Sequence, residues 1–285
     1  MNITVLSNRD LASNFALNQL LPALQGHRLT VYLSSRVGKA GLLPQGLRDL
    51  RFIEQSLFNQ LLTPLLNQQV LNQPVLNQQP FDLEHPTGNA SRLFSFDALA
   101  AYLDSPITEF NDINSAIGLA RLRATEPALI ISLRYGAILK AEAIKVPTHG
   151  VINLHSGRLP AYRGVMASFW GLLNSETELG TTLHYIHDAG IDTGSIIDTT
   201  SLRVNPARSY LWHVLNLYPA GCATIASTVA RLTQGEPIAS HHQPEGGDYY
   251  TFPTETELTR FSRLGLLLFD GDELVNFLQR YLDPK

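Results

Sequence analysis

The sequence lacks the residues on which disulfide-rich, zinc-binding and nucleic-acid-binding proteins depend. It has one cysteine, Cys222, in 285 residues, which excludes an intramolecular disulfide and a zinc site built from paired thiolates. Charged residues make up only 16% of the chain, where roughly 25% is usual for a soluble domain. The 21 basic and 25 acidic residues leave a formal charge of −4, which disfavours a general nucleic-acid binder.

Long apolar runs are also missing. No run approaches the roughly 20 residues of a membrane span, and the N-terminus, MNITVLSNRD, lacks the basic and apolar regions of a signal peptide. We therefore expect no membrane partner and a cytoplasmic location. Hydrophobic residues nevertheless make up 44%, which is enough for a sizeable core and excludes a wholly disordered chain.

The chain opens with the pattern of a βαβ unit. Residues 3–6 and 29–33 are apolar runs of strand type, and Phe15 to Leu24 recur at helical spacing between them. Ser7, Asn8 or Asp10 could cap this helix. The unit predicts an α/β fold with a parallel sheet.

Further elements follow along the chain. We expect a helix over 116–123, strands near 128–133, 151–154, 181–187 and 195–198, and a helix over 209–234 that Pro219 and Gly221 kink or interrupt. Residues 59–80 repeat Leu-Asn-Gln every five residues, which fits neither an amphipathic helix nor a strand. We interpret them as an exposed Gln/Asn-rich insertion, partly helical at most, without an assigned function.

The polar loop 241–248 separates a short terminal region from the rest. We therefore divide the chain into a main domain, 1–239, and a small C-terminal appendage, 240–285. The appendage has four basic and eight acidic residues, so it carries the whole net charge. Its apolar residues could serve docking on the core or contact in a homodimer.

Candidate chemistry gathers between residues 131 and 197. Asn153 and His155 are two apart, so on a strand they share a face, and they stand at its carboxyl end, where open α/β sheets place their ligands. Asp192 lies in a second loop flanked by glycine. An amide, an imidazole and a carboxylate suit acyl-type transfer. Taken singly, however, each is more often a turn residue, a satisfied histidine or a cap.

Two nearby histidines, His184 and His187, could be taken for a metal site, but structural roles are the better interpretation. On a strand, positions three apart face opposite sides, so the two cannot chelate together, and we expect structural roles. We expect no metal.

The ordered motifs resemble those of the formyltransferases that use 10-formyltetrahydrofolate. The family pattern is Asn-x-His, a Leu-Pro, an aromatic-Arg-Gly turn and a later Asp-x-Gly; here these are Asn153 and His155, 159–160, 162–164 and 192–194. One departure is Ser156-Gly157, where the family often has Pro-Ser. The resemblance implies a Rossmann-like, open, mostly parallel sheet over roughly residues 1–235.

The resemblance also implies a mechanism. An acceptor amine attacks the formyl carbon, Asn153 and protonated His155 stabilise the developing oxyanion, and Asp192 orients His155 and assists proton transfer. The formyl donor, 10-formyltetrahydrofolate, would bind in a cleft between residues 135–139 and 186–192. The lining candidates are Tyr135, Gly136, Leu139, Ile186, His187, Gly190 and Ile191.

The acceptor is narrowed by comparing branches of that family. Glycinamide ribonucleotide enzymes hold a phosphate in a Gly-rich loop after the first strand, but here that loop has no glycine, and Asp10 would repel phosphate. Methionyl-tRNA enzymes add a basic C-terminal barrel, whereas this appendage is acidic and short. Formyltetrahydrofolate hydrolases carry an N-terminal regulatory domain, for which the first strand at residue 3 leaves no room.

We therefore expect a small-molecule amine as acceptor, either an amino sugar or an amine of a siderophore or other secondary metabolite. A methionyl-tRNA formyltransferase-like enzyme and a hydrolase remain alternatives. A non-catalytic folate-binding or scaffold protein is the alternative from another class.

Overall fold

A seven-stranded sheet forms the centre of the computed structural model, which describes residues 1–35, 43–71, 92–100 and 103–282. The strand order is β3-β2-β1-β4-β5-β8-β9. The strands are β1 (Asn2–Asn8), β2 (Arg28–Ser34), β3 (Thr108–Glu109), β4 (Leu129–Leu133), β5 (Val151–His155), β8 (Thr182–Ile186) and β9 (Ile196–Thr199). Two small pairs complete the strands: β6 (Tyr162–Gly164) with β11 (Asp248–Tyr250), and β7 (Glu178–Leu179) with β10 (Leu202–Arg203).

The sheet is mostly parallel. All pairings from β3 to β5 are parallel, whereas β8 runs antiparallel to β5 and β9 antiparallel to β8. The predicted open, mostly parallel α/β sheet is therefore confirmed. The antiparallel edge was not predicted, because periodicity reveals a strand but not its direction.

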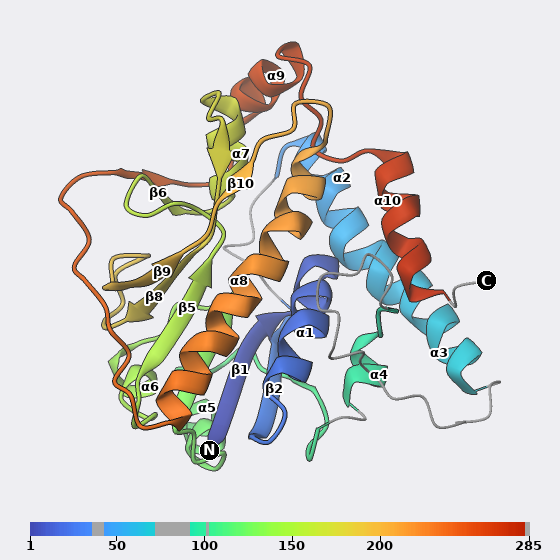
Figure 1. Cartoon of the computed structure of the whole chain (residues 1–285). Helices are drawn as coiled ribbons and strands as arrows, with labels where there is room; N and C mark the ends of the chain where they lie inside the picture. Colours follow the sequence, from blue (N-terminus) through green and yellow to red (C-terminus); the bar gives the residue numbers. More distant parts are fainter. Residues whose placement is uncertain (36–42, 72–91, 101–102, 283–285) are drawn as a thin grey trace.

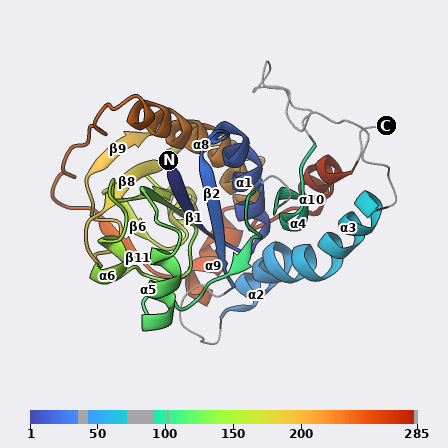
Figure 2. The same ribbon diagram turned by 90° about the horizontal axis from the view of Figure 1, so that it is seen from below.

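Helices cover both faces of the sheet (Figures 1 and 2). α1 (Leu11–Ala23) and α8 (Tyr210–Thr233) lie on one face, and α5 (Ala116–Arg123) and α6 (Ala141–Ile144) lie on the other. Val5 and Leu6 point to opposite faces and join two different apolar clusters, as strand alternation requires. The remaining helices are α2 (Gln45–Arg51), a π-helix (Phe52–Leu62), α3 (Thr63–Leu71), α4 (Phe96–Ala100), α7 (Ala167–Leu173), α9 (Glu255–Arg263), α10 (Gly271–Leu278) and a final 3-10 turn (Gln279–Tyr281).

Helix α8 is continuous from Tyr210 to Thr233, so the predicted interruption at Pro219 and Gly221 is wrong. A Cβ on Gly221 would lie 2.9 Å from the Leu154 side chain and 3.0 Å from Thr181 Oγ1. The glycine therefore lets α8 approach β5 closely. Its function is packing rather than ending the helix.

The start of α1 follows the predicted capping chemistry. Of the three candidate caps, Asp10 takes the position, and its Oδ1 accepts from the backbone N of Ser13 at 2.7 Å. This carboxylate satisfies an otherwise unpaired N–H at the helix end and lies against the positive end of the helix dipole.

The two regions that the sequence analysis separated from the rest are the insertion, 59–80, and the appendage, 240–285. The described part of the first is helical, and the second packs on the main core. Residues 59–71 of the predicted insertion belong to the π-helix and α3, while 72–80 lie outside the described residues. Past residue 240, Leu258, Phe261 and Leu274 share the apolar cluster of α1 and α8. None of the helices in the described part of the chain is both long and apolar enough to span a membrane.

Candidate active site

His155 lies at the carboxyl end of β5 and has its two ring nitrogens in different environments. Nε2 is 2.7 Å from the Tyr162 carbonyl oxygen. Because a carbonyl only accepts, Nε2 carries the proton and donates. Nδ1 faces Asp192 Oδ2 at 3.5 Å, which is an ion pair when the ring is protonated but too long for a strong hydrogen bond. The nitrogen on the Asp192 side is therefore the one that can gain or lose a proton.

Asn153 and His184 face each other across the antiparallel pair β5–β8. The His184 Nδ1 lies 2.8 Å from the Tyr185 carbonyl oxygen and so donates to it. In the neutral ring, Nε2 is then an acceptor, and Asn153 Nδ2 donates to it at 3.1 Å. This contact uses one N–H of the Asn153 amide and leaves the other for a ligand.

Asp192 lies between the two imidazoles. Its Oδ2 faces His155, its Oδ1 faces His184 Nε2 at 3.5 Å, and Oδ2 also accepts from the backbone N of Gly164 at 2.8 Å. Burial raises the pKa of the Asp192 carboxyl, but His155, His184 and the Gly164 N–H outweigh it and lower the pKa to about 2. The carboxylate is therefore ionised over the whole physiological range.

Backbone geometry brings these groups together. Asp192 has φ +55°, a left-handed conformation that few non-glycine residues adopt. A Cβ on Gly194 would lie 1.7 Å from the Tyr185 carbonyl oxygen, and a Cβ on Gly157 would lie 2.6 Å from His155 Nε2. Only glycine fits at either position, so the departure at Ser156-Gly157 has a local steric reason.

The structure thus brings the three predicted polar residues together and adds a fourth, His184. We expected His184 to be structural; it is buried, but it contacts both Asn153 and Asp192. His187, by contrast, lies 3.2 Å from Ser195 Oγ and stacks on Tyr185. Across the described residues, no group of three or more His, Cys, Asp or Glu side chains could hold a metal.

The predicted donor-lining residues fall into two groups. Tyr135, Leu139 and Ile186 belong to or pack against the apolar cluster on the α5–α6 side, the face to which Asn153 and His184 also point. Leu139 is buried in that cluster, and the Gly136 N–H already donates to Ser34 Oγ at 2.9 Å. Gly190 and Ile191 lie in the loop that leads to Asp192.

A cavity of about 420 Å³ opens at the other end of β5. Ile186 and His187 line it with His149, Tyr185 and Leu232, but the other predicted lining residues do not. Since Ile186 pairs with Val151 and Thr182 pairs with His155, this cavity lies a strand's length from the Asp192 cluster.

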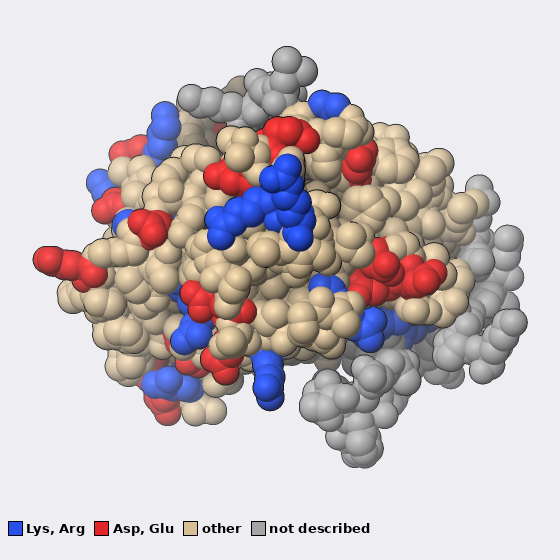
Figure 3. All heavy atoms as spheres, turned by 90° about the horizontal axis from the view of Figure 1, so that it is seen from above, with Lys and Arg blue, Asp and Glu red and all other residues tan. Residues whose placement is uncertain are grey.

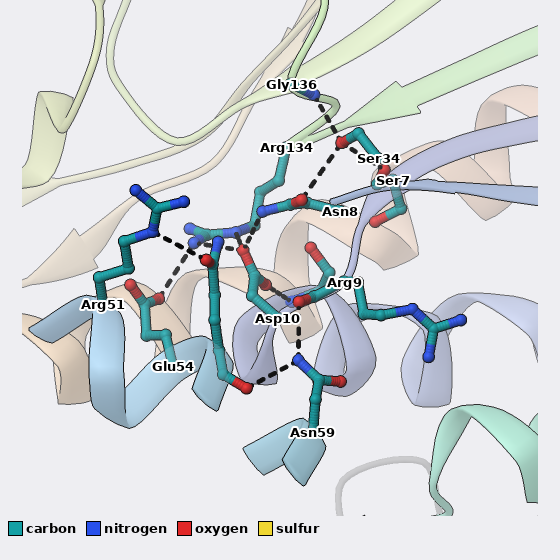
Figure 4. Close-up of polar contacts among 12 residues, drawn as sticks. Ser7, Asn8, Arg9, Asp10, Ser34, Arg51, Glu54, Asn59, Arg134 and Gly136 are labelled. Carbon is teal, nitrogen blue, oxygen red and sulfur yellow. Dashed lines mark hydrogen bonds and ion pairs between the residues drawn. The ribbon is translucent and has the colours of Figure 1, made fainter. Parts of the chain in front are cut away.

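A second polar network lies beside the first, at the carboxyl ends of β1 and β4 (Figure 4). Arg134 directly follows β4 and donates from Nε and Nη2 to Asp10 Oδ2 at 3.1 and 2.9 Å, and from Nη2 to Glu54 Oε1 at 3.0 Å. Asn8 Nδ2 also donates to Asp10 Oδ2, at 2.8 Å. The order of strands reverses between β1 and β4, so the network occupies the switch point where such sheets bind ligands.

The charges in this network are mutually compensated. Burial raises the pKa of Asp10, but the Arg134 guanidinium overrides this and holds the pKa below its usual range. Burial, aided by Asp10 and opposed by Arg134, raises the pKa of Glu54 to about 7. The N-terminus of α1 is thus already occupied by a carboxylate of the chain itself.

Comparisons with known proteins agree with this geometry. Residues 105–210 match the model of the formyl transferase family. A methionyl-tRNA formyltransferase of Geobacter metallireducens is 34% identical over 130 residues, which cover 46% of this chain and 42% of that protein. The chain therefore matches less than half the length of this relative.

Two solved structures share the fold at low sequence identity. A sugar N-formyltransferase from Shewanella has a TM-score of 0.55 at 14% identity, covering 93% of this chain and 87% of that one. A sugar 3N-formyl transferase, solved in the presence of dTDP and 5-N-formyl-THF, has a TM-score of 0.52 at 17% identity, covering 88% and 70%. The family model spans Asn153, His155, His184 and Asp192, so residues 105–210, which hold the whole polar cluster, are similar to the formyl transferase family.

Proposed function

We propose that this protein transfers the formyl group of 10-formyltetrahydrofolate to an amine of a small-molecule acceptor. The observation that carries the proposal is the Asp192 carboxylate, ionised between two buried imidazoles and beside the amide of Asn153. When bound, the folate supplies an activated formyl group. The residues fit such a donor, because an amide N–H, a protonatable imidazole and a carboxylate converge on one face of the sheet.

Each side chain has a role that follows from its contacts. Asn153 donates its second amide N–H to the formyl oxygen as negative charge develops there. His155, held through Nε2 by the Tyr162 carbonyl and facing Asp192 through Nδ1, supplies positive charge near the same oxygen when it is protonated. Asp192 stabilises the imidazolium and, directly or through water, takes the proton that the attacking amine loses and returns it to the donor nitrogen as the bond between that nitrogen and the formyl carbon breaks.

His184 completes this arrangement as a positioning residue. It fixes the Asn153 amide through Nε2 and is itself oriented by the Tyr185 carbonyl. Tyr135, Gly136, Leu139, Ile186, His187, Gly190 and Ile191 remain our candidates for contact with the folate. Since Leu139 is buried, a ring that contacts it requires the 135–139 segment to shift.

The acceptor is proposed from charge. Residues 240–285 contain four basic and eight acidic groups, which is unfavourable for contact with a phosphate backbone. On the face seen in Figure 3, one compact group of Lys and Arg near the centre lies next to Asp and Glu, and the other basic residues are scattered. Asp10 fills the helix N-terminus that would hold a substrate phosphate. A small amine, such as an amino sugar, fits these observations.

A second candidate acceptor is methionyl-tRNA. The observation that favours it is the sequence similarity to the Geobacter metallireducens enzyme, which is higher than that to either sugar formyltransferase. Binding of tRNA requires a basic surface, and it would weaken steeply as the salt concentration rises, whereas binding of a small amine would not.

The test is formyl transfer by the purified protein. Consumption of 10-formyltetrahydrofolate is followed with nucleotide-linked amino sugars, hydroxylamines, aliphatic amines and charged initiator tRNA. We expect turnover with a small amine, little dependence on salt, and roughly 10²–10³-fold loss in Asn153→Ala and His155→Ala. His27→Ala, which changes a histidine immediately before β2, is the matched control.

The alternatives give distinct results in the same assay. Release of formate without an amine would indicate a hydrolase. Folate binding by calorimetry without any turnover would indicate a binding protein. Salt-sensitive formylation of tRNA alone would replace the small-molecule proposal.

A further inference from the structure

The segment that follows α8 returns to the Asp192 loop. His241 forms an antiparallel bridge with Ile196 of β9, with N···O distances of 2.8 and 2.9 Å. Two residues later, Gln243 Nε2 lies 2.8 Å from the carbonyl oxygens of both Asp192 and Gly194. A side-chain amide has two N–H donors, and here both are directed at the turn that carries the carboxylate.

These two hydrogen bonds act on a turn whose backbone conformation few non-glycine residues adopt. Asp192 is left-handed at φ +55°, a conformation that persists only when its surroundings enforce it. Gln243 ties the carbonyl of Asp192 to that of Gly194, so the turn cannot relax without losing both bonds. The side-chain position of Asp192 between His155 and His184 depends on that turn.

The same segment also braces the other side of the site. β11 pairs in parallel with β6, and Val165 N donates to the Tyr250 carbonyl at 2.9 Å. β6 contacts both reacting groups: its Tyr162 carbonyl accepts from His155, and its Gly164 N–H donates to Asp192. Displacement of β11 would therefore move the partners of both side chains.

Aromatic packing and close backbone contact hold this pairing in register. The Tyr250 ring stacks on Tyr162 at 5.5 Å and on Trp170 at 4.8 Å between centroids. A Cβ on Gly247 would lie 1.9 Å from the Pro160 carbonyl oxygen, and one on Gly164 would lie 2.1 Å from that of Tyr250. Any side chain at Gly164 or Gly247 would clash with the opposite backbone, so these two glycines allow β6 and the 247–250 segment to lie this close.

We propose that residues 241–252 are an integral part of the catalytic site and that Gln243 is a positioning residue for Asp192. The inference rests on the proposed function, and it assigns a role to a region that we had separated from the main domain. Gln243 bonds only to backbone, so it acts through Asp192 rather than on the substrate.

The expected signature separates positioning from binding. In Gln243→Met, a side chain of similar length without donors, kcat falls about 10–100-fold, the effect of small misplacement of a reacting group. KM for the donor and the acceptor changes less than threefold. Gln243→Glu keeps the shape but turns a carboxylate toward two carbonyl oxygens, and it is expected to lose at least as much.

An independent readout keeps this test separate from the test of formyl transfer. The ring resonances of His155 and His184 are titrated by NMR in the wild type and in Gln243→Met. These rings face Asp192, which is also contacted by the Gly164 N–H and held by Gln243 itself. Loosening Asp192 changes the distance of its carboxylate from both rings, so the variant and the wild type are expected to give different ring titration curves.

The outcomes decide the proposal even if the wild type transfers no formyl group. The positioning role is supported if both rings titrate differently in Gln243→Met and Gln243→Glu while Gln25→Met, which changes an exposed glutamine, matches the wild type. Unchanged titration in folded Gln243 variants overturns it. If Gln243→Met unfolds, the same criterion is applied to Gln243→Glu, whose thermal unfolding is measured alongside.

Discussion

Two polar networks lie side by side at the carboxyl edge of the sheet, and they differ in the kind of cation they hold. At β1 and β4, Arg134 carries a permanent charge and is bound by the carboxylates of Asp10 and Glu54. At β5 and β8, one carboxylate, Asp192, serves two imidazoles that can lose their protons. In the first network the fixed charges compensate one another, whereas the second is the one to which we assign proton transfer.

The largest effect is expected from the network around Asp192, to which we assign the chemistry. Asp192→Asn replaces the charge with an amide of the same shape, and we expect about 10³-fold lower turnover, because the imidazolium loses its counter-ion. Initial rates of formyl-donor consumption measure the effect. Asp198→Asn, an exposed carboxylate on β9, is the control, and equal rates for both variants would place the chemistry elsewhere.

Substitution in the Arg134 network should lower the stability of the fold. Arg134→Met leaves Asp10 and Glu54 buried without their cation, which should cost about 3–5 kcal/mol of unfolding free energy in urea. Arg51→Met removes an exposed arginine that bonds to Gln55 and should change stability by less than about 0.5 kcal/mol. A small loss in Arg134→Met would show that the network is not structural.

Acid should remove the stabilisation that the Asp192 carboxylate gives to the folded state. The Asp192 pKa of about 2 is below its unfolded value of 3.8, so this carboxylate stabilises the folded state above pH 4 and loses that effect as the pH falls toward 2. The contribution amounts to about 2 kcal/mol. Urea unfolding of wild type and Asp192→Asn at several pH values should show the difference between them shrinking in acid.

The pH dependence of stability expected from Glu54 has the opposite sign to that expected from Asp192. Its pKa is raised to about 7, so its contribution is fully present below about pH 4.5 and is lost as the pH rises through 7. Glu54→Gln keeps an acceptor for Arg134 and should flatten that decline. If wild type and variant show parallel pH profiles of stability, Glu54 titrates normally.

Much of the fold follows from local patterns in the sequence. The opening strands and α1 have clear periodicity, and α5 occupies the predicted residues 116–123. The direction of β8 could not be predicted, because an antiparallel edge has the same alternation as a parallel one. That direction brings His184 opposite Asn153, and the contact between these two side chains was therefore not predicted.

The candidate site was predictable where residues act at the ends of strands and in glycine-flanked loops. Those positions made Asn153, His155 and Asp192 candidates, the resemblance to the formyltransferases selected them, and the structure brings them into one cluster. Gln243 carries no such signal, since it lies in a polar loop 51 residues beyond Asp192 and binds only backbone oxygens. Contacts of this kind depend on tertiary packing rather than on any local pattern.

The position of β11 late in the chain has a consequence for biosynthesis. The ribosome completes β5, β8 and the Asp192 turn well before it adds Gln243 and β11, and domains begin to fold during synthesis. On our proposal, a nascent chain can thus form the sheet with its reactive groups in place but not locked. Competence to transfer a formyl group would then arise only when residues 241–252 have emerged and β11 has paired with β6.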